Sequence, residues 1–191
     1  WEIRRLDVPG GTLQGVSYCA TCDGAFYKDK TVAVIGGGDT ALGDAMYLSR
    51  MAKKVYLVHR RQEFRANQAL QTAVQQNAAI ELVLDAVPTA VLGEKRVDHL
   101  ELLQNGASKT LPVDGVFVAI GSIPNTDFLG DLCKLDESGY ILADETGVTT
   151  TPGVFAAGDV RTTPLRQVVT AVADGANCVQ SIEQYFRKGN G

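Results

Sequence analysis

The feature that most constrains this sequence is a short apolar segment that leads directly into a glycine-rich turn. Residues 31–35 are apolar and mostly β-branched, which is typical of a buried strand. Gly36-x-Gly38-x-x-Ala41 follows, and residues 41–51 carry apolar side chains at helical spacing. Such glycines let the backbone turn tightly and approach a pyrophosphate at the helix N-terminus. The order therefore predicts a dinucleotide-binding β–α–β unit, with a ligand-free glycine turn as the alternative.

The pattern downstream extends this unit into an α/β fold. Strands are expected at 55–58, 80–84 and 116–120, and a helix at 67–76. Residues 90–111 alternate in short segments and predict an antiparallel ribbon or meander, with Asn105-Gly106 as its hairpin turn. We therefore expect a Rossmann-like, three-layer domain with a central parallel sheet and a small antiparallel sheet.

The two ends of the chain have a different character. Residues 1–15 are punctuated by glycine and proline and are interpreted as an entry linker. A domain boundary is expected near residues 121–126, which divides the chain into domains 1–122 and 123–191. In the second domain we expect strands at 140–142 and 154–159 and a closing helix at 166–187.

Charge and hydropathy exclude several classes of protein. The 191 residues include 18 Lys and Arg and 22 Asp and Glu, a formal net charge of −4, so no net basic field attracts nucleic acid. No apolar run approaches the roughly 20 residues that cross a bilayer, and the first residues lack the apolar core of a signal peptide. We expect a cytoplasmic protein that binds neither nucleic acid nor membrane.

A basic cluster stands where the second strand of the predicted unit ends. In NAD-binding units an acidic residue at this position accepts the ribose 2′-hydroxyl. Here the position holds His59-Arg60-Arg61, and Arg65 follows a turn later. Because guanidinium groups bind phosphate in a bidentate manner, the cluster favours NADP(H), with its 2′-phosphate, over NAD(H). The alternative is a solvated basic face.

The cysteine pattern adds a second kind of chemistry. Of four cysteines, Cys19 and Cys22 form a C-x-x-C pair, which can close a disulfide, bind a metal or be two idle thiols. Zinc needs further ligands at suitable spacing, and none is evident, so we expect no metal. A redox pair is favoured, with the neighbouring Asp23 able to move protons or merely to cap a turn. Cys133 and Cys178 stand among apolar residues and are expected to be buried thiols.

Taken together, the motifs closely resemble those of the low-molecular-weight, bacterial-type thioredoxin reductases. The most specific is Cys19-Ala20-Thr21-Cys22-Asp23 just before the nucleotide-binding strand. The others are the glycine turn at 36–41, the basic run at 59–66, the segments 117–126 and 152–160, and the pair Arg166-Gln167. The resemblance extends over essentially the whole chain.

This resemblance implies a flavoprotein that passes electrons from NADPH through FAD to the Cys19–Cys22 disulfide and on to thioredoxin. Cys22 would lie against the flavin, Cys19 would attack thioredoxin, and Asp23 would be the acid or base. The residues implied for NADPH are Gly36, Gly38, Asp39, Thr40, His59, Arg60, Arg61 and Arg65. Those implied for FAD are Gly158, Asp159, Arg166, Gln167 and Val168. The family also implies a homodimer and a rotating NADPH domain, hinged before Gly15 and around residues 121–125.

Two departures from the family bear on function. The family's Ala-x-Glu-Glu-Ala is replaced by Ala41-Leu42-Gly43-Asp44-Ala45, and glycine inside a helix costs about 1 kcal/mol relative to alanine. The family's N-terminal FAD segment has no counterpart in residues 1–18, so we expect a fragment with an incomplete FAD site that is inactive alone. The alternatives are the reductase component of a peroxiredoxin system and, from another class, a non-catalytic NADPH-binding module.

Overall fold

The computed structural model describes residues 2–189, which fall into two compact units. Residues 4–121 form the larger unit, and residues 2–3 together with 122–189 form the smaller one. The chain therefore passes between the units twice, after Ile3 and after Gly121. The expectations for residues 1, 190 and 191 lie outside the described residues.

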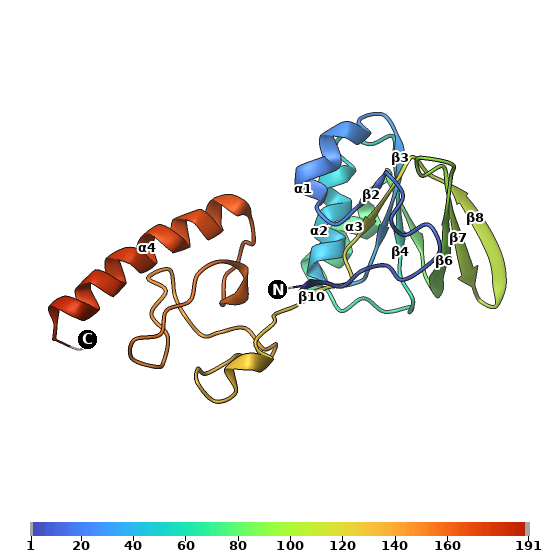
Figure 1. Ribbon diagram of the computed structural model, residues 1–191. Coiled ribbons are helices and arrows are strands. Elements are labelled where there is room, and N and C mark those ends of the chain that lie inside the picture. Colours follow the sequence, from blue (N-terminus) through green and yellow to red (C-terminus); the bar gives the residue numbers. More distant parts are fainter. Residues whose placement is uncertain (1, 190–191) are drawn as a thin grey trace. The chain divides into compact units, whose positions relative to one another are not determined.

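A five-stranded parallel sheet forms the centre of the larger unit (Figure 1). Its order is β2 (Val16–Ser17), β9 (Gly115–Val118), β3 (Thr31–Ile35), β4 (Lys54–Val58) and β5 (Ile80–Val83). In the register, Val34 of β3 lies beside Leu57 of β4 and Phe117 of β9. All three side chains are almost wholly buried, which explains why the strands are continuous apolar runs.

Helices cover one face of this sheet. The helices α2 (Asp39–Leu48) and α3 (Gln68–Gln76) pack with Val32, Val34 and Leu57 in one apolar cluster. A short α1 (Ala20–Asp23) and the 3-10 turn η1 (Gly24–Tyr27) belong to the same layer. Gly24 permits this packing, because a Cβ there would stand 3.0 Å from side-chain atoms of both Tyr47 and Leu48.

A three-stranded antiparallel sheet covers the opposite face. It consists of β6 (Ala86–Leu92), β7 (His99–Gln104) and β8 (Ala107–Pro112) in that order. Its Leu100 and Leu102 pack with Ala33 and Tyr56, whose side chains alternate with those that face the helices. Asn105 and Gly106 have φ of 51° and 80°, as a two-residue type I′ hairpin requires. The predicted three-layer α/β fold and its meander are thus confirmed.

The prediction of an entry linker at residues 1–15 is wrong for the described part of that segment. Leu6, Val8 and Leu13 pack against the apolar cluster beneath the antiparallel sheet. The backbone N–H of Val91 donates to Pro9, and that of Val97 donates to Gln14. The glycines and Pro9 mark turns in this segment, and the segment packs on the larger unit because its apolar residues cover the cluster.

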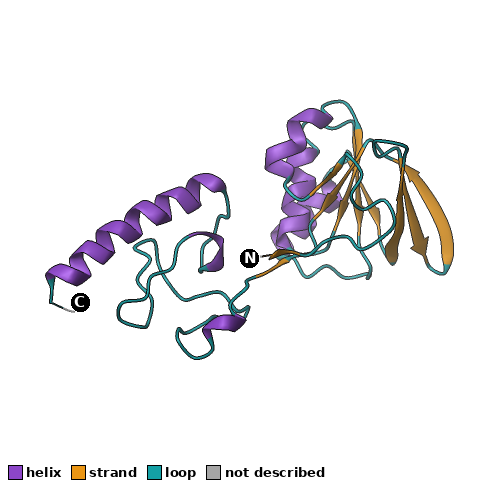
Figure 2. Ribbon diagram, in the orientation of Figure 1, coloured by secondary structure: helices purple, strands orange, loops and turns teal. Residues whose placement is uncertain are grey.

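The smaller unit is poor in regular structure (Figure 2). Its strands β1 (Glu2–Ile3) and β10 (Ser122–Ile123) pair with each other, and 3-10 turns form η2 (Asp127–Leu129) and η3 (Gly158–Val160). The expected closing helix is α4 (Val168–Arg187), with a capping box between Gln167 and Thr170. The strands predicted at 140–142 and 154–159 are wrong, since Ile141 and Phe155 form only isolated bridges. Such short apolar runs become strands only where a partner extends the ladder.

Candidate functional site

The glycine turn at the carboxyl end of β3 has the geometry of a close backbone approach. Gly36 has φ of +150°, and a Cβ there would stand 2.3 Å from the carbonyl oxygen of Ala119 and 2.7 Å from Cβ of Ala41. Gly38 is the N-cap of α2, and a Cβ there would meet open space. The turn therefore leaves the amides at the start of α2 open to a ligand, and a pyrophosphate fits this cradle.

The basic loop after β4 folds over this turn. The backbone N–H of Arg65 donates to Gly37 at 2.8 Å, while Arg60, Arg61 and Arg65 expose their side chains. Asp39 accepts hydrogen bonds from the backbone and the amide of Asn67, both at 2.8 Å. The structure therefore brings the glycines, Thr40 and the three arginines to one edge of the sheet, and it gives Asp39 a structural partner there.

His59 lies beneath the turn. Its ring is buried, stacks on Phe64 at a centroid distance of 5.4 Å, and places Nε2 3.2 Å from the carbonyl oxygen of Glu63. Burial lowers the pKa of His59, and the neighbouring arginines lower it further, against the effect of the Glu63 carbonyl. A neutral His59 therefore supports the turn from below, while the arginines carry the positive charge.

The C-x-x-C pair forms a disulfide between Cys19 and Cys22. Cys19 is the N-cap of α1, and its Sγ accepts the backbone N–H of Cys22 at 3.2 Å. Cys22 is exposed and Cys19 is half-buried. The disulfide is accordingly placed at the surface of the larger unit, where another molecule can reach it.

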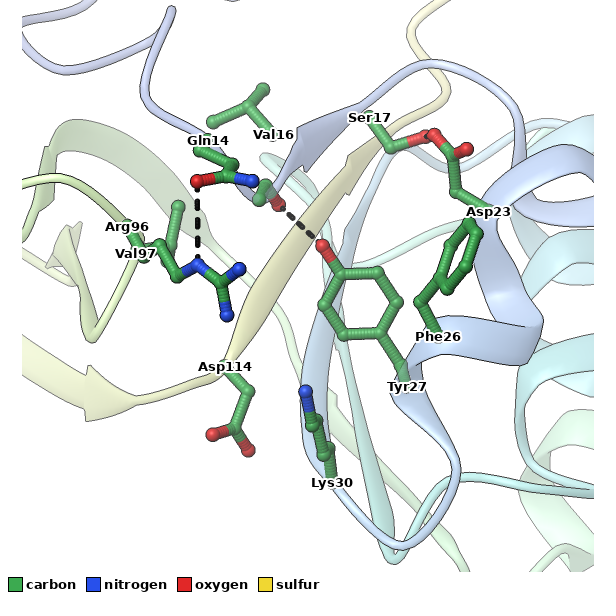
Figure 3. A pocket seen from close by; sticks show the side chains of 11 residues that line it. Gln14, Val16, Ser17, Asp23, Phe26, Tyr27, Lys30, Arg96, Val97 and Asp114 are labelled. Carbon is green, nitrogen blue, oxygen red and sulfur yellow. Dashed lines mark hydrogen bonds between the residues drawn. The ribbon is translucent and has the colours of Figure 1, made fainter.

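Ser17 joins Asp23 to this disulfide, and the sequence analysis missed it. Its hydroxyl donates to Oδ2 of Asp23 at 2.7 Å and accepts the backbone N–H of Cys19 at 3.1 Å. Figure 3 shows the Ser17 hydroxyl directed at the Asp23 carboxylate. A lone serine at the end of a strand gives no periodic signal; only its place two residues before Cys19 could have suggested the contact.

Ser17 and Asp23 also line a cavity of about 600 Å³ (Figure 3). Tyr27, Lys30, Arg96 and Asp114 line it as well, and Nε of Arg96 donates to Gln14 at 3.3 Å. Burial raises the pKa of the Tyr27 hydroxyl, and Asp23 raises it further. Asp23 therefore has access to a volume of the size that holds small molecules or water.

The residues expected to hold FAD surround η3 in the smaller unit. Gly158 has φ of +78°, and its backbone N–H donates to Oδ2 of the buried Asp174 at 2.9 Å. Arg166 donates to the carbonyl oxygen of Asp159 at 3.3 Å and lies 4.0 Å from the centroid of the Tyr140 ring. Gln167 caps α4, and Val168 is 82% exposed. The turn at Gly158 is thus preformed, and the apolar side chain of Val168 at the start of α4 is uncovered, which fits part of a flavin site.

The two remaining cysteines are buried, as the sequence predicts. Cys178 donates to the carbonyl oxygen of Ala156 at 3.5 Å, and burial raises the pKa of its thiol. Among residues 2–189, no group of His, Cys, Asp and Glu could hold a metal ion. Within the same residues, none of the helices combines the length and apolar character needed to span a membrane.

A dinucleotide-type glycine turn and a surface disulfide lie in one folded unit, the combination that is typical of pyridine nucleotide-disulphide oxidoreductases. The chain belongs to the pyridine nucleotide-disulphide oxidoreductase family, which matches residues 2–175. It is 43% identical over 193 aligned residues to a thioredoxin reductase of Listeria innocua, covering 98% of this chain and 60% of that protein. It is 41% identical to a thioredoxin reductase of Treponema pallidum, covering 97% of this chain and 62% of that protein.

Solved structures agree with these relatives. Thioredoxin reductase from Streptococcus pyogenes superposes with a TM-score of 0.91 at 39% identity, covering 98% of this chain and 63% of that one. Thioredoxin reductase from Giardia duodenalis superposes with a TM-score of 0.90 at 37% identity, covering 97% of this chain and 63% of that one. The chain thus spans about three fifths of the length of the relatives that it matches.

Proposed function

We propose that this chain is the part of an NADPH-dependent thioredoxin-disulfide reductase that binds NADPH and carries the redox disulfide. The observation that carries the proposal is the Cys19–Cys22 disulfide, which lies in the same folded unit as the glycine turn. Family membership and the names of the relatives support it. Domains 1–122 and 123–191 would be the NADPH domain and the C-terminal part of the FAD domain.

NADPH would bind at the carboxyl edge of the parallel sheet. Gly36 and Gly38 would let its pyrophosphate approach the start of α2, where Thr40 is also exposed. Arg60, Arg61 and Arg65 would bind the 2′-phosphate, because guanidinium groups offer paired donors to phosphate oxygens. His59 would position the turn from below, and Asp39 would hold the basic loop after β4 in place through Asn67.

FAD, when bound, supplies a two-electron relay between nicotinamide and disulfide. On this chain, Gly158 and Asp159 would bind its ribityl and phosphate part. Arg166, Gln167 and Val168 would lie toward the isoalloxazine ring. The preformed turn at Gly158 and the exposed Val168 support this assignment.

The cysteines would complete the reaction by thiol–disulfide exchange. In the reduced pair, the Cys19 thiolate attacks a thioredoxin disulfide, forms a mixed disulfide and releases one thiolate of the partner. Cys22 then loses its proton and attacks Sγ of Cys19, which reforms the Cys19–Cys22 disulfide and releases the second partner thiolate. Asp23 would take the proton from Cys22 and return it to a leaving thiolate.

Three further features are part of the proposal. The NADPH domain would rotate on the two crossings of the chain, next to the paired strands β1 and β10. Proline in place of the glycines before Gly15, which are Gly10 and Gly11, or in place of Gly121 should slow turnover of the intact enzyme. The intact enzyme would be a cytoplasmic homodimer.

Thioredoxin reduction by the intact enzyme tests the proposed function. NADPH oxidation is followed with FAD and oxidised thioredoxin present, in wild type and in Cys22→Ser. Turnover that needs both Cys22 and thioredoxin supports a thioredoxin reductase. NADPH binding without any disulfide reduction would instead show a nucleotide-binding module.

A further inference from the structure

A single buried hydroxyl connects the two groups that must act together in disulfide exchange. Ser17 is 5% exposed, at the end of β2. Its Oγ lies 2.7 Å from Oδ2 of Asp23 and 3.1 Å from the backbone nitrogen of Cys19. One side chain thus fixes both the backbone at the first cysteine and the carboxyl at the proposed acid or base.

The chemistry explains why such a link matters. When Cys22 attacks the mixed disulfide at Cys19, its S–H bond breaks, and the proton must go to a base within hydrogen-bond reach. Asp23 follows Cys22 directly, and its N–H bonds to the carbonyl oxygen of Cys19 at 3.1 Å, which fixes its backbone but not its carboxyl. Of the two carboxyl oxygens, Ser17 holds Oδ2.

We propose that Ser17 is a positioning residue that holds the Asp23 carboxyl beside the redox cysteines for proton transfer. The inference rests on the acid–base role of Asp23 in the proposed function. Ser17 itself neither gains nor loses a proton overall: it donates to the carboxylate and can accept from the carboxylic acid. A proton that arrives on Oδ1 leaves the hydrogen bond from Ser17 to Oδ2 as it is, and one that arrives on Oδ2 only reverses its direction, so the heavy atoms need not move in either case.

The cavity beside these residues supports the assignment. Ser17 and Asp23 both line it, together with Tyr27, Lys30 and Asp114 (Figure 3). Because its volume of about 600 Å³ is large enough for water, Asp23 can exchange its proton with solvent. A carboxyl that is open to water on one side needs an anchor to keep one position, and Ser17 is that anchor.

The reduced chain can be tested with Ellman's reagent, an aromatic disulfide that reports each exchange step by its coloured thiolate. The first thiolate marks attack by one cysteine and the second marks resolution by the other. Ser17→Ala should slow the second step about tenfold, the effect of losing a hydrogen bond to a charged group, and leave the first nearly unchanged. It should also change the dependence of the second step on pH as Asp23→Asn does.

Matched variants separate positioning from folding. Threonine and valine have the same shape and differ by a hydroxyl group. A faster second step in Ser17→Thr than in Ser17→Val therefore measures the effect of the hydroxyl alone. Ser49→Ala is the control, because it removes a remote hydroxyl of the same unit that also makes two hydrogen bonds. In Ser17→Ala/Asp23→Asn the second step should be no slower than in Asp23→Asn alone.

Two results would overturn the proposal. One is an equal rate of the second step in Ser17→Thr and Ser17→Val. The other is that Ser17→Ala slows the first and second steps by the same factor at every pH. If Asp23→Asn also leaves the second step unchanged, the acid–base role of Asp23 in the proposed function fails as well. If Asp23→Asn slows it and the Ser17 variants do not, only the positioning role fails.

Discussion

Gly37 lies directly against the imidazole ring of His59. A Cβ at residue 37 would stand 2.2 Å from Cε1 of the ring, closer than any side chain allows. The ring cannot easily move away, because it is buried and stacks on Phe64. The middle glycine of the turn is therefore required by packing beneath it, whereas Gly38 faces open space.

This difference predicts opposite results for two similar substitutions. Gly37→Ala should lower the free energy of unfolding of the larger unit by about 2 kcal/mol through overpacking. Gly38→Ala should leave stability within about 1 kcal/mol but weaken NADPH binding, because its Cβ points to where the pyrophosphate would lie. Urea unfolding and calorimetric titration with NADPH measure both effects. Equal stability of the two variants would contradict the packing argument.

The sequence could predict the larger unit because its signals are periodic. The apolar run at 31–35, the helical spacing after it and Asn105-Gly106 each follow from local backbone rules, and the structure has all three elements. In the smaller unit the two predicted strands are only three and six residues long, and a run such as 140–142 does not reveal whether a partner strand exists.

Single polar residues of the site were harder to find. Ser17 and Asp174 act through contacts with residues at positions 23, 158 and 161, which no spacing rule encodes. His59 was placed correctly at the end of a strand, but its burial beneath Gly37 depends on the fold of the loop at 59–67. Partners that come together only in three dimensions leave no pattern in one sequence.

The basic loop after β4 should set the preference for NADPH over NADH. Arg60→Ala and Arg61→Ala should each weaken NADPH binding about tenfold, because each removes a charge-assisted contact to the 2′-phosphate. NADH lacks this phosphate and should bind more weakly than NADPH to the wild type. The two substitutions should hardly change the affinity for NADH. The matched control is Arg50→Ala, an exposed arginine just beyond α2. If NADH binding falls as much as NADPH binding, the arginines do not recognise the 2′-phosphate.

Asp44 should make the larger unit less stable as the pH rises. Burial raises its pKa from 3.8 to about 6, so the folded state binds the proton more tightly than the unfolded chain. The resulting stability is fully present below the unfolded pKa and is lost as the pH rises through about 6. Asp44→Asn should therefore stabilise the unit by about 2 kcal/mol at neutral pH and by much less in acid.

Urea unfolding in acid and at neutral pH, followed by circular dichroism, measures how Asp44→Asn changes the free energy of unfolding. The exposed Glu183→Gln is the control, expected to change stability by less than about 0.5 kcal/mol. A gain from Asp44→Asn that is the same in acid and at neutral pH would show that the carboxyl is not desolvated.

The buried ion pair between Arg161 and Asp174 should hold the smaller unit together. Nη2 of Arg161 lies 2.5 Å from Oδ1 of Asp174, and Nε lies 2.7 Å from Oδ2, which also accepts the N–H of Gly158. Asp174→Ala leaves a buried guanidinium without its counter-ion, so it should cost about 3–5 kcal/mol. Arg161→Met/Asp174→Leu replaces both charges by apolar groups and should recover most of this loss.

The same pair predicts an acid-sensitive stability for the smaller unit. The hydrogen bonds from Arg161 lower the pKa of Asp174, so its contribution is present above the unfolded pKa of 3.8 and is lost as the pH falls through the folded value. Thermal unfolding of wild type and the double variant is measured from neutral pH into acid. The unfolding temperature should fall more steeply with decreasing pH in the wild type. Parallel curves would mean that the pair contributes no pH-dependent stability, and that packing of α4 alone holds the turn at Gly158.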